Sequence, residues 1–171
     1  MLASQVQVVE QSQQRAFQVL LEEHWRIVLK VTNTFGRTRE DRGDLIQEIS
    51  LQLWRAFPKY DAKRTFSTWM YRIALNVAIS YARSSGYRNR WTVPLEDDHP
   101  QEVEAALDER SAFLREFIDG LDQLDRALML LYMEEHSYQQ ISEILGISET
   151  NVATKISRLK KRARTEFENR M

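Results

Sequence analysis

The segment from Ser137 to Arg164, SYQQISEILGISETNVATKISRLKKRAR, constrains the fold of this chain more than any other. Ser137 with Gln140 three residues later is a capping box, which predicts the start of a helix. Gly146 fits the C-cap of that helix, and Ser148 fits the N-cap of the next one. Apolar residues at helical spacing give both helices a shared buried face: Ile141, Leu145, Ile147, Val152, Ile156 and Leu159. The pattern therefore predicts a helix-turn-helix.

The opposite face of the second predicted helix is polar, and residues 155–164 hold six basic residues and no acidic residue. Short polar side chains near a helix N-terminus suit base edges in a major groove, and cations further along suit phosphates. A helical hairpin with a solvated basic face is the alternative, but so much unpaired like charge favours DNA. We predict base contacts from Asn151, Thr154 and Arg158, and backbone contacts from Lys155, Lys161 and Arg162.

The rest of the chain also predicts helices. Only 5 Gly and 3 Pro among 171 residues leave few turns, which favours long helices over a sandwich of short strands. Periodic apolar residues over 17–31, 44–57 and 66–83 predict three helices around one core, and helical pattern resumes at about residue 102. We expect an all-α fold of two helical domains, residues 1–90 and 102–171, the second containing the helix-turn-helix. A flexible acidic linker, residues 91–101, joins them.

Composition and charge exclude several classes of function. The chain has no cysteine, so disulfide frameworks, thiol catalysis and iron–sulfur clusters are excluded. The sequence holds no apolar run near the ~18 residues of a membrane span and begins without a signal-peptide pattern, so a cytoplasmic location is expected. Glu96 and His99 form the one Glu-x-x-His pair and lie in the linker, so neither a di-metal site nor enzymatic activity is expected.

Net charge is +6 over residues 1–95, −7 over 96–121 and 0 over 122–171, which favours nucleic acid at both ends.

The predicted helix over residues 44–57 has an unusual outward face. Its core face holds Leu45, Ile46, Ile49, Leu53, Ala56 and Phe57. Acids beside large apolar groups favour a protein partner over DNA, because the acids repel phosphate. A second core contact with the first helix is the alternative. The outward residues are Asp44, Gln47, Glu48, Leu51, Trp54 and Arg55.

Residues 59–83 interleave basic and aromatic side chains, a pattern typical of proteins that bind single-stranded nucleic acid. Amide side chains can also hold an unstacked base. Aromatic residues at helical spacing are more often part of a core, and we predict this for Phe66, Met70, Ile73 and Val77. The basic and aromatic residues are Lys59, Lys63, Arg64, Phe66, Trp69, Tyr71 and Tyr81, beside a polar stripe of Thr68, Arg72, Asn76 and Arg83.

The segments DLIQEISLQLW, FSTWMYRIALNVAISYAR and the helix-turn-helix stand in the order and spacing of a known family. Across nearly its whole length the chain resembles the extracytoplasmic-function (ECF) sigma factors of bacterial RNA polymerase. The resemblance implies a region 2 domain that binds core polymerase and recognises and melts the minus-ten promoter element. It also implies a region 4 domain that recognises the minus-thirty-five element.

Site residues follow from the same resemblance. It implies that Asp44, Gln47, Glu48, Leu51 and Trp54 bind the β′ clamp helices of core polymerase. It implies that the loop of Lys63, Arg64 and Phe66 captures a flipped minus-ten base, and that the melting helix contributes Trp69, Tyr71, Arg72 and Asn76. For the minus-thirty-five element it implies Asn151, Thr154, Lys155, Ser157, Arg158, Lys161 and Arg162.

The resemblance also bounds what the chain binds. Ala153 and Ser157 stand where family members often carry basic or aromatic residues, so the promoter sequence cannot be copied from a relative. The acidic linker resembles the connector that follows the RNA exit path. Expected partners are core RNA polymerase and promoter DNA, with an anti-sigma factor as a further candidate, and neither a cofactor nor a metal is expected. The alternative is a dimeric helix-turn-helix transcriptional regulator, which would need neither the aromatic and basic segment nor the outward face of residues 44–55.

Overall fold

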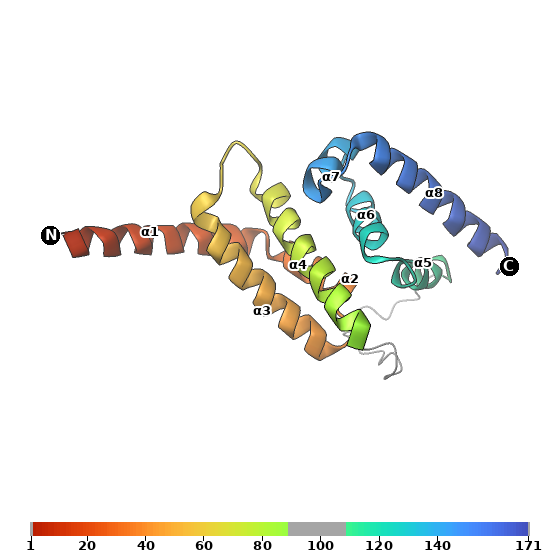
Figure 1. The fold of residues 1–171 in the computed structure, drawn as a ribbon, viewed down its shortest axis with the longest axis horizontal. Helices are drawn as coiled ribbons and strands as arrows, with labels where there is room; N and C mark the ends of the chain where they lie inside the picture. The colour runs from red at the N-terminus through yellow and green to blue at the C-terminus, as the bar shows by residue number, and fades with distance from the viewer. Residues whose placement is uncertain (1, 89–108, 171) are drawn as a thin grey trace.

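The computed structural model describes residues 2–88 and 109–170, and within them every regular element is helical (Figure 1). The predicted all-α class is confirmed. No helix in the described ranges is long and apolar enough to span a bilayer. The N-terminal domain holds α1 (Leu2–Glu23), α2 (Trp25–Phe35), α3 (Arg39–Ala56), the short 3-10 helix η1 (Phe57–Lys59) and α4 (Phe66–Arg88). The C-terminal domain holds α5 (Glu109–Asp119), α6 (Gln123–Met133), α7 (Tyr138–Leu145) and α8 (Glu149–Glu168).

Helix boundaries in the N-terminal domain differ from the sequence-based expectation. The first periodic segment is divided at His24 into two helices. The helix expected from Asp44 begins at Arg39, because Thr38 and Asp41 form a capping box. The helix expected to end at Arg83 continues through Gly86 to the end of α4, since one glycine costs a helix only ~1 kcal/mol. The predicted linker, residues 91–101, lies outside the described residues.

The N-terminal core forms where α4 lies against α2 and α3. Of the face predicted to be core on α3, Leu45, Ile49 and Leu53 are fully buried, whereas Ile46, Ala56 and Phe57 are half-buried. Their alternation with exposed residues fixes which side of α3 points outward. Other fully buried residues of this core are Val28, Val31, Met70, Ala74 and Ala78.

The predicted helix-turn-helix is confirmed in α7 and α8. The Ser137 and Gln140 side chains form the capping box, and Gly146 adopts the left-handed conformation at φ 68°. The hydroxyl of Ser148 caps α8, and Ser142 Oγ donates to the Ile147 carbonyl at 2.6 Å across the turn. The second helix of the motif, α8, has 20 residues. Its inner residues Val152, Ile156 and Leu159 are buried with Ile141, while Leu145 and Ile147 are half-buried.

The two domains share one hydrophobic core, which the sequence did not predict. Both α6 and α7 pack against α4, and α6 also contacts α2 (Figure 1). A single cluster of buried residues joins Val31 of α2 and Leu75 of α4 to Leu131 of α6 and Ile144 of α7. We call this the packed arrangement. It places the predicted melting helix directly beside the helix-turn-helix.

Candidate polymerase and nucleic-acid interfaces

The outward residues of α3 form a continuous mixed surface, which we call the α3 face: Asp44, Gln47, Glu48, Leu51 and Trp54. All five are exposed, including 41% of Leu51 and 42% of Trp54. The Trp54 ring rests against the ring of Phe17 on α1, with 5.2 Å between centroids. The sequence predicted that acids and large apolar groups of this helix point outward together, and the exposure of these residues agrees with that prediction.

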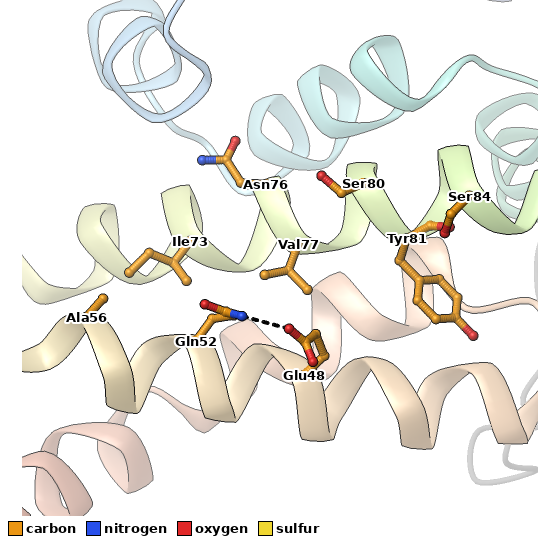
Figure 2. A pocket seen from close by; sticks show the side chains of 9 residues that line it. All are labelled: Glu48, Gln52, Ala56, Ile73, Asn76, Val77, Ser80, Tyr81 and Ser84. Carbon is orange, nitrogen blue, oxygen red and sulfur yellow. Dashed lines mark hydrogen bonds between the residues drawn. The ribbon is translucent and has the colours of Figure 1, made fainter.

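A groove of about 550 Å³ lies between α3 and α4 (Figure 2). Apolar side chains such as Ile73 and Val77 line it, and Asn76 and Ser80 stand on its α4 rim. Glu48 stands on the α3 rim and accepts a hydrogen bond of 2.8 Å from Gln52. The groove thus lies between Glu48 of the α3 face and the exposed polar residues Asn76 and Ser80 of α4. The predicted polymerase and minus-ten surfaces are neighbours.

The loop before α4 presents two cations and buries one ring. Lys63 and Arg64 are exposed, and the Tyr60 hydroxyl donates to the Arg64 carbonyl at 2.8 Å, which shapes the loop. Phe66 is only 5% exposed and sits among aromatic rings, 5.4 Å from Tyr60 and 5.1 Å from Trp69. The structure therefore corrects the expectation for Phe66, because in this conformation the ring is part of the core and is not available to a base.

The melting helix is only partly accessible. Arg72 and Asn76 are exposed, and Trp69 is half-buried. Tyr71 is 3% exposed, because the His136 ring of the C-terminal domain covers it edge-on at 5.0 Å. Burial, with a smaller contribution from Glu134, raises the pKa of Tyr71 to about 12. This corrects the expectation that Tyr71 belongs to an exposed DNA surface: in the packed arrangement the other domain covers it.

The outer side of α8 is exposed at several of the residues predicted to contact bases and phosphates. Asn151, Thr154, Ser157, Arg158 and Lys161 are all exposed. The Thr154 hydroxyl donates to the Thr150 carbonyl at 2.8 Å, which fixes its rotamer. This side of α8 lies opposite the buried stripe of Val152, Ile156 and Leu159, as a helix that enters a groove requires.

Two predicted phosphate contacts are instead engaged within the protein. Lys155 Nζ lies 2.8 Å from Asp125 Oδ1 on α6, and both side chains are largely covered. Arg162 Nε lies 2.6 Å from Glu166, and its guanidinium stands 5.4 Å from the centre of the Phe117 ring. The prediction counted charge along one segment, and so it could not include Asp125, a partner thirty residues earlier in the chain.

A second groove, of about 500 Å³, includes two basic residues that the sequence analysis missed, Lys160 and Arg164. It lies between the start of α7 and the middle of α8 and is lined by Tyr138, Ser157, Lys160, Lys161, Arg164 and Thr165. Its lining has three cations and no acid. The spacing of Ser157, Lys161 and Arg164 at one helical turn was a signal in the sequence that could have identified this side of α8. We call these residues the α8 basic groove.

Comparison with known proteins finds two family models that match this chain. The family model "Sigma-70 region 2" matches residues 20–87, and "Sigma-70, region 4" matches residues 111–162. The ECF RNA polymerase sigma-E factor of Haemophilus influenzae is 27% identical, over 97% of this chain and 93% of that protein. This chain belongs to the ECF sigma factors. As an ECF sigma factor it directs promoter recognition, DNA melting and transcription initiation, and its partners are RNA polymerase and promoter DNA.

A further relative matches this chain at a similar identity, and two solved structures resemble it in fold. The RNA polymerase sigma-H factor of Pseudomonas aeruginosa is 28% identical, over 90% of this chain and 86% of that protein. The structure of CnrH in complex with the cytosolic domain of CnrY has a TM-score of 0.66 at 21% identity, covering 91% of this chain and 90% of that one. Sigma factor RpoE in complex with the anti-sigma factor NepR from Bartonella quintana has a TM-score of 0.67 at 16% identity, covering 91% and 96%. Both solved structures share this fold.

Proposed function

We propose that this ECF sigma factor divides its work among three surfaces. The α3 face binds the β′ clamp helices of core polymerase, α4 and its preceding loop bind the minus-ten element, and α8 binds the minus-thirty-five element. The proposed domains are residues 1–90 and 102–171, joined by the linker 91–101. The protein acts in the cytoplasm and has no enzymatic activity of its own. The observation that carries this proposal is the separation of an acidic and apolar face on α3 from a cationic face on α8.

The α3 face suits a protein partner because of its mixed chemistry. Leu51 and Trp54 offer exposed apolar area for a contact core, and Asp44 and Glu48 exclude phosphate and favour basic side chains. A DNA-binding surface would need the opposite charge. The polymerase contact is therefore assigned to α3, and DNA to α4, on the other side of the 550 Å³ groove, and to α8.

The minus-ten contacts are assigned to exposed groups around α4. Lys63 and Arg64 supply cations for the backbone, and Trp69 and Asn76 supply a ring and an amide for an unstacked base. Arg72 lies one turn before Asn76 on the same exposed stripe. Phe66 supports Trp69 from within the aromatic cluster.

The minus-thirty-five contacts are assigned to the outer side of α8. Asn151, Thr154 and Arg158 contact bases, and Ser157 and Lys161 continue this surface toward the phosphates. The α8 basic groove adds Lys160 and Arg164 as phosphate contacts, which is a refinement on the sequence-based set. Lys155 and Arg162 act as positioning residues that hold α8 against α6 and α5.

We also propose an anti-sigma factor as a partner. The solved sigma factor RpoE, which shares this fold, is in complex with the anti-sigma factor NepR. Such a partner would have to cover the same exposed surfaces that polymerase and promoter need.

The experiment is a titration with a bacterial core RNA polymerase, followed by run-off transcription on templates that the holoenzyme selects from a random DNA library. The double variant Asp44→Arg with Glu48→Arg should lose core binding by several kcal/mol, because two reversed charges meet a complementary surface. A matched variant, Glu22→Arg with Glu23→Arg, makes the same charge change on α1 and should bind normally. A dimeric helix-turn-helix regulator would bind DNA without core polymerase, so unchanged core affinity of the α3 variant would reject the proposal.

A further inference from the structure

Two edges of α8 border the residues assigned to bases, and these edges differ in charge. Successive residues of a helix are rotated by about 100°, which places Asn151, Thr154 and Arg158 in the middle of the exposed side. We call one border the groove edge, because it lines the α8 basic groove: Ser157, Lys160, Lys161 and Arg164. We call the other border the paired edge: Lys155, Arg162 and Glu166.

The groove edge carries positive charge that no carboxylate offsets. Lys160 Nζ donates to the Tyr132 hydroxyl at 3.2 Å and stands 5.4 Å from the centre of the same ring. A hydroxyl and a ring orient this ammonium group without adding a negative charge. Lys161 and Arg164 are exposed, and neither forms an ion pair with any residue that the structure describes. Three positive charges therefore line this edge.

The paired edge contains as many acids as cations. Lys155 Nζ lies 2.8 Å from Asp125 Oδ1 of α6, with 28% and 20% of the two side chains exposed. Arg162 Nε lies 2.6 Å from Glu166 Oε1, one turn further along α8. This second pair is exposed and contributes little to stability, but its carboxylate still stands on the same edge. A phosphate on the paired edge would therefore meet no net positive charge.

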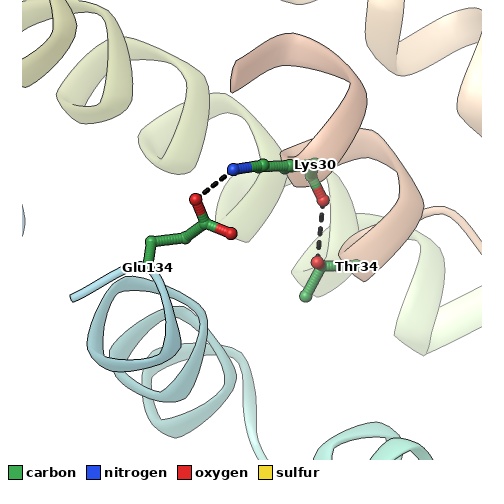
Figure 3. A network of polar contacts seen from close by, with 3 residues as sticks. All are labelled: Lys30, Thr34 and Glu134. Atoms are coloured by element: carbon green, nitrogen blue, oxygen red, sulfur yellow. Dashed lines mark hydrogen bonds and ion pairs between the residues drawn. The ribbon is translucent and has the colours of Figure 1, made fainter. Parts of the chain in front are cut away.

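Other cations around α6 are also engaged within the protein. Lys30 Nζ of α2 forms an ion pair with Glu134 at the C-cap of α6 (Figure 3). Arg126, the cation of α6 itself, is only 7% exposed, and its guanidinium donates to the Asp119 carbonyl at 2.6 Å. The carboxylates of Asp125 and Glu134 thus each hold a cation of another helix. Beside the paired edge, α6 has no exposed cation to offer a DNA backbone.

A helix in a major groove lies between two backbones, one from each strand. With the base-contacting residues in the middle, the groove edge faces one backbone and the paired edge faces the other. The cations of the groove edge extend from Lys160 to Arg164, which is about 6 Å along the helix at ~1.5 Å per residue, and Glu168 on the next turn ends this edge. Because the phosphates of one strand follow one another every ~3.4 Å along the duplex axis, these cations cover about two of them.

We propose that α8 holds the minus-thirty-five element by the backbone of one strand. Lys160, Lys161 and Arg164 contact about two neighbouring phosphates of that strand, and the other backbone lies along the paired edge without a charge contact. This inference rests on the proposed function, because it uses the assignment of α8 to the minus-thirty-five element. The two strands are distinguished by charge alone, so this preference does not depend on which bases α8 reads.

The first experiment neutralises one phosphate at a time. Duplexes of a selected template carry a single methylphosphonate within the minus-thirty-five element, in one strand or the other, and compete for the holoenzyme. About two neighbouring positions of one strand should lower the affinity about three- to tenfold each, because each loses a charge contact. Positions of the other strand should leave the affinity unchanged or raise it slightly, since Asp125 and Glu166 stand on that side. Equal losses on both strands would overturn the proposal.

The second experiment assigns the sensitive strand to the groove edge. Lys160→Gln with Arg164→Gln removes two charges from this edge, so the loss caused by the methylphosphonate should disappear at one or both sensitive positions. The matched control, Lys155→Gln with Arg162→Gln, removes two charges from the paired edge and should retain the losses on one strand. Urea unfolding checks that both variants are folded under the binding conditions. Unchanged losses at both positions in the groove-edge variant would contradict the proposal.

A third comparison tests the proposed function on the same duplexes. Arg158→Ala should relax base preference if α8 reads the minus-thirty-five element. If the preference relaxes while neither strand responds to methylphosphonates, the one-strand contact is wrong and the assignment of α8 stands. If the preference is unchanged while one strand responds, the base assignment is wrong and the one-strand contact stands.

Discussion

The two helices assigned to DNA are held in place by different contacts beside their buried apolar residues. An ion pair between Lys155 and Asp125 ties α8 to α6, and the Arg162 guanidinium stands over the Phe117 ring of α5. These contacts leave other cations of α8, such as Arg158 and Lys161, exposed to solvent. Aromatic and apolar packing anchors α4, with Phe66 in the aromatic cluster and Tyr71 under His136. One surface is complete in the free protein, and the other is partly covered.

This difference follows from the form of DNA that each helix is proposed to meet. Duplex recognition uses hydrogen bonds and charge, so the outer side of α8 can remain in water at no cost. Binding of separated strands uses rings on which bases stack, and exposed rings are apolar surface that a free protein tends to cover. In this chain the C-terminal domain provides part of that cover.

On the α8 side, the largest expected change in DNA affinity comes from substitutions that distinguish base contacts from phosphate contacts. Arg158→Ala should cost about 1–3 kcal/mol and relax preference at one base pair, because a guanidinium fork can hold guanine through two hydrogen bonds. Lys161→Ala should weaken all sequences alike and reduce the salt slope by about one. Binding of selected and scrambled duplexes across a salt series distinguishes them, and swapped outcomes would mean that α8 is rotated about its axis relative to our assignment.

On the α4 side we expect loss of melting without loss of initial binding. Trp69→Ala should cost about 1–3 kcal/mol in the open complex, because base stacking on a ring is of that size, and Asn76→Ala about 1 kcal/mol. Ser80→Ala is the matched control, because Ser80 is exposed one turn after Asn76 and has no assigned base. Permanganate footprinting measures opening. A pre-melted bubble should rescue both variants, and absence of rescue would contradict the assignment.

A smaller effect tests whether Lys155 belongs to the anchor or to the DNA surface. Lys155→Gln should lower the free energy of unfolding by about 0.2–1 kcal/mol, through loss of the pair with Asp125, and leave the salt slope of DNA binding unchanged. Lys161→Gln should do the reverse. Urea unfolding and a salt series on the same variants provide both readouts. A lower salt slope in Lys155→Gln would return this residue to the phosphate contacts.

The smallest effect concerns pH and the cover over α4. Burial lowers the pKa of His136 below its ordinary value of 6.5, against the opposing effects of a hydrogen bond with Gln140 and the charge of Glu134, while Lys30 lowers it further. Tyr71, the other group facing the ring, stays neutral because its pKa is about 12. The packed arrangement therefore favours neutral His136: its stability is complete above pH ~6.5 and declines as the pH falls below that value. The distance between dyes placed on Glu40→Cys and Ser111→Cys, both exposed positions, should lengthen on acidification to about pH 5.5 in an otherwise native chain and not when His136→Gln is added.

Sequence patterns predicted the helix-turn-helix closely because its signals are local. The capping residues Ser137, Gly146 and Ser148 bond to backbone groups only three or four residues away, so their roles can be inferred without knowledge of the fold. The outward orientation of Asp44 and Glu48 was predictable for the same reason, from the periodicity of a single helix. Whether these residues bind polymerase stays a prediction.

Contacts between distant parts of the chain were not predictable. The burial of Tyr71 depends on His136, and the ion pair of Lys155 depends on Asp125. In both cases the partner is far away along the chain, so the sequence around Tyr71 or Lys155 gives no sign of the contact. The burial of Phe66 follows from its periodic position on α4, which indicated core, whereas the resemblance indicated a base contact. Here the local pattern described the free protein better.

The buried guanidinium of Arg126 gives the packed arrangement a particular dependence on temperature. Hydration of a charged group becomes less favourable on warming, so the cost of keeping Arg126 away from water falls as temperature rises. Apolar burial between the domains weakens on cooling. Both trends act in the same direction, so cold should separate the two domains while each keeps its own helices, and the dye distance should lengthen on cooling with no change in circular dichroism.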